Sequence, residues 1–117
     1  MDKKSALSAL AALGQDTRLE VVRLLVTAGG QGVPAGEIAS RLGAVQNTMS
    51  AHLKILYQAG LARPERDGRI VRYVADMTAF RDLLAYLMED CCNGSPEFCR
   101  PVIDAVTCDC RAVPEIA

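Results

Sequence analysis

Residues 46–74 read QNTMSAHLKILYQAGLARPERDGRIVRYV, and this stretch decides the fold because its periodicity changes halfway along. Met49, Leu53 and Leu56 stand at i, i+4 and i+7. This is the spacing of a helix that buries one apolar face. Gly60 interrupts the pattern. The first half therefore predicts a helix that ends just before this glycine.

The second half of the stretch has the alternating character of β-strands. Leu61 to Glu65 and Arg69 to Ala75 flank Asp67-Gly68, a dipeptide favoured in two-residue hairpin turns. The second of these segments is rich in β-branched and aromatic residues. The sequence predicts an antiparallel hairpin directly after the helix.

Three further helices are predicted upstream. The first covers Ser5 to Leu13, the second runs from a cap at Asp16 to Gly29-Gly30, and the third begins with Pro34 in its first turn and ends at Gly43. The last of these is short and is joined by a turn to the helix described above, which is a helix-turn-helix arrangement. The first helix is amphipathic, with Leu7, Leu10 and Leu13 three residues apart, and the second has an apolar stripe formed by Leu19, Val22, Leu25 and Val26. In the third helix, Ile38 and Leu42 are expected to face inward.

A fifth helix is predicted after the hairpin, with Asp76 or Thr78 as its cap and an end near residues 90–92. Its apolar face consists of Phe80, Leu83, Leu84 and Leu87. Beyond Pro96 only a turn of helix around 102–106 is expected. The expected fold class is mainly α with a small β-hairpin, a winged helix-turn-helix. We expect residues 1–92 to form this domain and residues 93–117 to form a cysteine-containing tail.

Charge is distributed unevenly although the net charge of the chain is only −1. The segment 41–72 holds six basic and two acidic residues, whereas the segment 73–117 holds three basic and eight acidic ones. A basic middle and an acidic tail are typical of a domain with one surface that faces DNA. No apolar stretch approaches the roughly 20 residues that span a bilayer. We expect a cytoplasmic protein that does not bind membranes.

The motifs along the chain resemble those of the ArsR/SmtB family of metal-sensing repressors. The resemblance covers roughly residues 5–90. The motifs that carry it are Asp16-Thr17-Arg18-Leu19, Glu37-Ile38-Ala39, the run from Met49 to Leu56 followed by Ala59-Gly60-Leu61, and Asp67-Gly68-Arg69 with Tyr73. The family implies a winged helix-turn-helix homodimer whose first and last helices form the interface. The apolar faces of these two helices support a dimer independently, because so small a domain would struggle to bury them alone; they contain Leu7, Leu10, Leu83, Leu84 and Leu87. It also implies a regulator rather than an enzyme.

The helix over 46–59 is the expected recognition helix, and the hairpin is the expected wing. Amides and hydroxyls can bond base edges or phosphates, and cations can hold the phosphate backbone. His52, the only histidine, is expected to contact DNA or to form a hydrogen bond at the helix surface. The expected partner is double-stranded operator DNA, and no cofactor is required for binding it. The expected DNA-binding residues are Gln46, Asn47, Thr48, Ser50, His52, Lys54, Arg66, Arg69 and Arg72.

All five cysteines lie within the last 27 residues of the chain. The odd number and the lack of an export signal speak against a disulfide framework. Cys91, Cys92 and Cys99 resemble the C-terminal arsenic site of some arsenic-responsive members of the family. Trivalent arsenic and antimony are soft and need only three thiolate sulfurs. We therefore expect As(III) or Sb(III) as the inducer, and Cys108 and Cys110 as either accessory residues or merely exposed ones.

Two other kinds of sensor stay open on the same fold. Zinc or cadmium would require a fourth ligand, which Cys108 or Cys110 can supply. A regulator that responds to thiol oxidation is the second alternative. A redox enzyme is disfavoured because the chain has no C-x-x-C motif and because Glu89-Asp90 precede the first cysteine pair.

Overall fold

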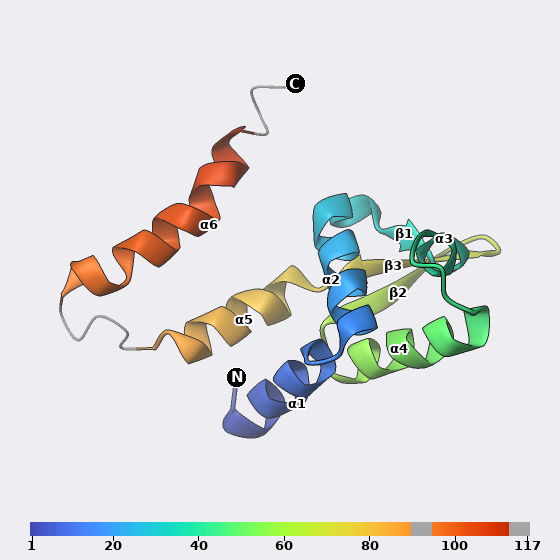
Figure 1. Ribbon diagram of the computed structural model, residues 1–117, viewed down its shortest axis with the longest axis horizontal. Coiled ribbons are helices and arrows are strands. Elements are labelled where there is room, and N and C mark those ends of the chain that lie inside the picture. The colour runs from blue at the N-terminus through green and yellow to red at the C-terminus, as the bar shows by residue number, and fades with distance from the viewer. Residues whose placement is uncertain (90–94, 113–117) are drawn as a thin grey trace. The chain divides into compact units, whose positions relative to one another are not determined.

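The computed structural model describes residues 1–89 and 95–112, with side chains described for 1–89 and 95–106. The chain divides into two compact units, Met1–Tyr86 and Leu87–Ala117. The elements, labelled in Figure 1, are α1 (Lys3–Leu13), α2 (Asp16–Ala28), the 3-10 turn η1 (Gly29–Gln31), β1 (Val33–Pro34), α3 (Ala35–Arg41), α4 (Gln46–Gln58), β2 (Ala62–Asp67), β3 (Ile70–Ala75), α5 (Met77–Leu87), the 3-10 turn η2 (Pro96–Phe98) and α6 (Arg100–Ala112).

The first unit contains a three-stranded antiparallel sheet in the order β1-β3-β2. The predicted hairpin is confirmed: Ala62 pairs with Ala75, and Asp67 pairs with Ile70 across a turn that contains Gly68. The prediction did not include β1, whose Val33 pairs with Tyr73. Two residues are too few to show a period of two, so this strand is defined by its partner rather than by its own sequence.

The core of the first unit forms where α2 and α4 pack on the sheet. Helix α2 packs on β3, and α4 packs on β2 (Figure 1). Met49 and Leu53 are at most 2% exposed and Leu56 is fully buried, so the predicted inward face of α4 is confirmed. Leu25 of α2 and Leu61, which precedes β2, are fully buried in the same core.

Helix α1 packs on its own unit through alanines, a face that was not predicted. Ala6, Ala9 and Ala12 are buried, whereas Leu7 and Leu10 are exposed. Alanines let two helices approach closely, and this packing decides which side of α1 faces the core of its own chain. In α2 the predicted apolar stripe is only partly buried. Leu19 and Val26 are exposed, and the buried residues are Val21, Val22 and Leu25.

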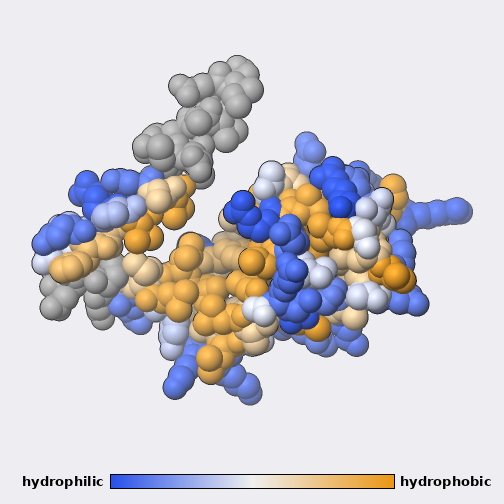
Figure 2. Space-filling model, in the orientation of Figure 1, coloured by the Kyte–Doolittle hydropathy of each residue, from blue (hydrophilic) through white to orange (hydrophobic). Residues whose placement is uncertain are grey.

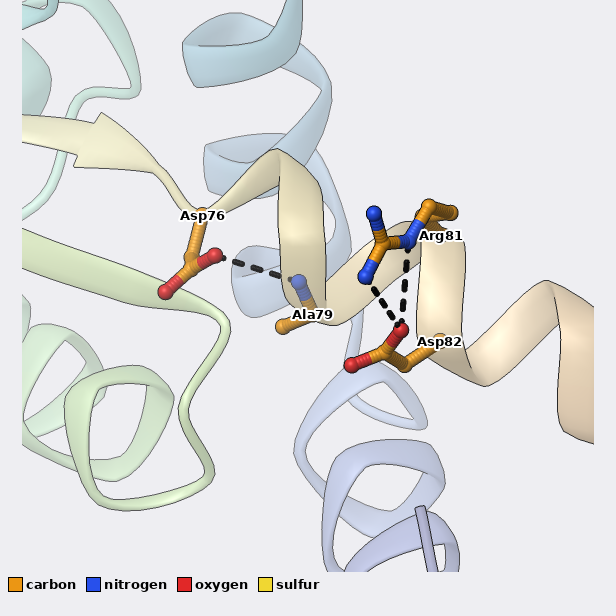
Figure 3. Close-up of polar contacts among 4 residues, drawn as sticks. All are labelled: Asp76, Ala79, Arg81 and Asp82. Carbon is orange, nitrogen blue, oxygen red and sulfur yellow. Dashed lines mark hydrogen bonds and ion pairs between the residues drawn. The ribbon is translucent and has the colours of Figure 1, made fainter.

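Three helices of the first unit begin with a side-chain cap. Asp2 accepts a hydrogen bond from the Ser5 N–H at 2.7 Å, and Gln15 accepts one from the Arg18 N–H at 2.8 Å. The Ser5 amide holds the pKa of the Asp2 carboxyl below its ordinary value. Asp76 Oδ1 accepts from the Ala79 N–H at 3.1 Å, which confirms the cap predicted for the fifth helix (Figure 3).

The second unit contains a longer helix than the sequence predicted. Only a turn around 102–106 was expected, but α6 extends over Arg100–Ala112. Helix α5 ends at Leu87, before the predicted end at 90–92, and residues 90–94 lie outside the described part of the chain. Among the described residues, none of the helices has both the length and the apolar character that crossing a membrane requires.

Candidate DNA-binding surface and thiol site

Helix α4 presents one polar face to solvent because its apolar face is used by the core. Five of the predicted DNA-binding residues on α4 are exposed: Gln46, Asn47, Thr48, Ser50 and Lys54. Within the described part of the chain, neither a side-chain hydrogen bond nor an ion pair engages any of these five. Their amide, hydroxyl and ammonium groups are therefore available to base edges and phosphates.

The turn between α3 and α4 fixes the position of this polar face. Gly43 adopts a φ of 63°, and the Ala44 N–H donates to the Ala39 carbonyl at 3.0 Å. The turn leads directly to Val45, the residue before α4, whose side chain is 69% exposed. Helices α3 and α4 thus form a helix-turn-helix with the first turn of α4 open to a ligand as large as a DNA duplex.

The three predicted DNA-binding arginines of the wing differ in their surroundings. Arg66 and Arg69 are exposed, and neither has an ion pair with another described residue. Arg72 is half-buried, and its Nη2 lies 3.7 Å from Asp67 Oδ2. Arg63, which was not predicted to bind DNA, lies 3.5 Å from Glu65 and 3.9 Å from Asp76. Arg66 and Arg69 are therefore the wing cations most available to phosphates.

His52 lies on the flank of α4 rather than on its exposed polar face, and it is half-buried. Its Nδ1 is 3.3 Å from Arg18 Nη1 on α2. Of the two roles predicted for this residue, the structure places it in a hydrogen bond at the helix surface. No role was predicted for Arg18, because two residues 34 positions apart leave no local signal in the sequence.

The structure describes only one of the predicted thiol ligands at the side-chain level. Cys99 is half-buried and follows η2, with its Sγ 3.7 Å from the Pro96 carbonyl oxygen. Cys91 and Cys92 lie outside the described residues, and Cys108 and Cys110 lie on α6 without described side chains. Among the described residues, no three His, Cys, Asp or Glu side chains form a metal-binding group.

A patch of exposed leucines marks another surface of the first unit. Leu7 and Leu10 of α1 are 57% and 41% exposed, and Leu84 of α5 is 50% exposed. Figure 2 shows hydrophobic residues gathered over the region that α1 and α5 form in Figure 1. On α5, Arg81 Nη2 lies 3.1 Å from Asp82 Oδ1, so the two charges that precede Leu84 in this helix compensate each other (Figure 3). This apolar patch is the surface expected of an interface between subunits.

Comparisons with known proteins agree with this geometry. A family model described as a helix-turn-helix domain matches residues 13–65. The crystal structure of a possible transcriptional regulator for arsenical resistance is 30% identical, with a TM-score of 0.58, and the match covers 83% of this chain and 95% of that one. No curated protein matches the chain.

Two further solved structures are similar to the chain. HlyU from Vibrio cholerae N16961 is 28% identical, with a TM-score of 0.58, and the match covers 74% of this chain and 97% of that one. The homodimeric winged helix-turn-helix DNA-binding domain of Mb0332 from Mycobacterium bovis, a possible ArsR-family regulator, is 27% identical with a TM-score of 0.58. That match covers 74% of this chain and 80% of that one.

The helix-turn-helix, the wing and these similarities define a DNA-binding transcriptional regulator with a winged helix-turn-helix fold. The chain belongs to the ArsR family of transcriptional regulators. The expectation of a regulator rather than an enzyme is confirmed by this membership.

Proposed function

We propose that this protein is a cytoplasmic, homodimeric repressor that binds operator DNA and releases it when a trivalent metalloid binds to its cysteines. The observation that carries the DNA-binding part is the polar face of α4, whose five exposed side chains have no partner among the described residues. In a homodimer, two such helices read half-sites about one helical turn apart in the major groove.

The exposed leucines of α1 and α5 support the dimer. A domain of this size gains stability by covering Leu7, Leu10 and Leu84 against a second copy, and the similar domain from Mycobacterium bovis is homodimeric. Arg66 and Arg69 bind phosphates beside the base-reading α4. Such contacts supply affinity, whereas the side chains of α4 supply sequence preference.

The proposed inducer is As(III) or Sb(III), bound by the thiolates of Cys91, Cys92 and Cys99. The adjacent cysteine pair, the softness of sulfur and the 30% identity to a possible regulator for arsenical resistance support this choice. The ion must bind the DNA-free form more tightly than the DNA-bound form. A coupling free energy of about 1–3 kcal/mol is typical of such regulation.

A titration with purified protein tests the proposal. Duplexes selected from a random pool by the wild-type protein serve as operator probes, and DNA binding is measured by fluorescence anisotropy while arsenite, cadmium, zinc or a thiol oxidant is added. We expect arsenite to release the DNA at lower concentration than cadmium or zinc. If zinc or the oxidant releases the DNA and arsenite does not, the inducer is zinc or thiol oxidation rather than a metalloid.

Cysteine variants assign the ligands. Cys91→Ser, Cys92→Ser and Cys99→Ser should each keep DNA binding and lose the arsenite response. Cys108→Ser and Cys110→Ser test the two other thiols: a weakened arsenite response identifies an accessory ligand, and an unchanged response identifies a merely exposed cysteine. X-ray absorption of the arsenite complex should show three sulfurs around arsenic. A Cys99→Ser variant that remains fully inducible would remove Cys99 from the site.

A further inference from the structure

The side chain of Arg18 connects three helices of the first unit. Its Nε donates to the Ala12 carbonyl in the last turn of α1 at 2.7 Å, and its Nη1 lies 3.3 Å from His52 Nδ1 on α4. Its backbone N–H donates to Gln15 Oε1 at 2.8 Å, so the residue itself is fixed at the start of α2. All three contacts are partly buried.

The chemistry of each contact suits a guanidinium. Ala12 belongs to the last turn of α1, where carbonyl groups lack helical partners and carry the negative end of the helix dipole, so a cation is stabilised there. A guanidinium has donors and no acceptor, so Nδ1 of His52 accepts the other hydrogen bond. The planar arrangement of donors fixes the angle between the two contacts, which a lysine ammonium would not do.

The two helices that Arg18 connects, α1 and α4, carry different functional surfaces. Helix α1 presents the exposed Leu7 and Leu10, and α4 presents the exposed polar side chains. Helices α1 and α4 also pack on each other directly. In a dimer built on α1, any rotation of α4 against α1 would move both recognition helices and change the distance between them.

We infer that Arg18 and His52 are a positioning pair that holds α4 at a fixed angle to α1 and thereby sets the spacing of the two recognition helices. This inference rests on the proposed DNA binding by a homodimer, and it assigns neither residue a contact with DNA. Loss of the pair lowers the preference for the operator over other duplexes, because phosphate contacts tolerate misplacement and base contacts do not.

A double-mutant cycle tests the pair. Arg18→Ala, His52→Ala and the combined variant are compared with wild type for binding to a selected operator and to an unrelated duplex of the same length. We expect each single variant to weaken operator binding roughly tenfold, about 1.4 kcal/mol, with a much smaller change on the unrelated duplex. The combined variant should bind the operator with about the affinity of the more weakly binding single variant, because both substitutions remove the same interaction.

A conservative variant and a matched control complete the test. His52→Asn places Oδ1 near the position of Nδ1 and should bind the operator almost as well as wild type. Arg23→Ala removes the same charge from an exposed position on the same helix and should leave the operator preference unchanged. Sedimentation and thermal unfolding of every variant separate misplacement from loss of the dimer or of the fold.

The outcomes distinguish the inference from the proposed function. Additive losses in the combined variant, or a His52→Asn variant as weak as His52→Ala, would overturn the positioning pair while DNA binding stands. If Arg18→Ala does not fold, the comparison of His52→Ala with His52→Asn decides alone. A wild-type protein that selects no duplex would overturn the proposed function and, with it, this inference.

Discussion

Gly32 shows how strictly a single residue is constrained in this fold. It has a φ of 68°, and a Cβ added there would lie 2.6 Å from the Tyr73 carbonyl oxygen, on the strand that pairs with β1. Gly32→Ala combines a strained backbone with a clash against backbone atoms that a rotamer change does not relieve. We expect a loss of about 2 kcal/mol or more in the free energy of unfolding, measured by urea denaturation.

Gly30 offers the control for this substitution. It lies two residues earlier, does not adopt a positive φ, and has no atom within 4 Å of an added Cβ. Gly30→Ala should change the free energy of unfolding by less than about 1 kcal/mol, with stabilisation as the expected sign because the unfolded chain loses freedom. Equal destabilisation by both variants would show that the close approach of Gly32 to Tyr73 is not the cause.

Val45 is a poor residue for the N-cap position of a helix, because its side chain has no hydrogen-bond acceptor. It is the N-cap of α4, makes no side-chain capping hydrogen bond and is 69% exposed. Val45→Ser supplies a hydroxyl that can accept from the free N–H groups of the first turn. The substitution should raise the free energy of unfolding by about 1 kcal/mol. Val45→Ala removes the same methyl groups without adding an acceptor. If both variants are equally stable, the absence of a cap does not limit the stability of α4.

At the scale of elements, the wing makes a testable electrostatic contribution. Arg66→Ala and Arg69→Ala should each weaken binding to all duplexes by a similar factor. Each should also reduce the slope of log K against log salt by about one. The measurement is a salt titration by anisotropy. Arg63→Ala is the matched control on β2, because Arg63 already lies beside Glu65 and Asp76. A wing variant with an unchanged slope would not contact phosphate.

The elements that could be predicted are those whose signals are local. Met49, Leu53 and Leu56 repeat at helical spacing, and Asp67-Gly68 marks a turn, so α4 and the hairpin were predicted within a few residues. Strand β1 has no such signal because Val33-Pro34 becomes a strand only through its pairing with β3. The extent of α6 was missed because the prolines and acidic residues beyond Pro96 led to the expectation of little helix, although proline is tolerated in the first turn of a helix.

The candidate sites also contain features that the sequence could predict and features that it could not. Exposure of Gln46, Asn47, Thr48, Ser50 and Lys54 follows from the position of the buried face of α4, so the sequence could predict it. The contact between Arg18 and His52 depends on how α2 and α4 pack, and no sequence pattern contains that information. The thiol ligands Cys91 and Cys92 stay a prediction, since they lie outside the described residues.

At the scale of the whole molecule, the face that α1 leaves exposed is informative. The chain uses three alanines for its own core and leaves Leu7 and Leu10 outside, although leucine gains more from burial. A monomer would leave these side chains in water, together with Leu84 of α5. In the proposed dimer, a second copy removes the surface from water in both subunits at once, which would account for the outward position of the larger side chains.

The exposed leucines of α1 and α5 provide a test of the proposed dimer. Leu7→Glu combined with Leu84→Glu places charges within the apolar patch of each subunit and should convert the dimer to a folded monomer, measured by sedimentation equilibrium. Because two linked recognition helices bind an inverted repeat far more tightly than one, operator affinity should fall by a factor of about 100 or more. Ile70→Glu, at a 49% exposed position beside the hairpin turn, controls for the added charge and should remain dimeric. A double variant that stays dimeric would place the subunit interface on another surface and would leave the outward leucines of α1 without a physical explanation.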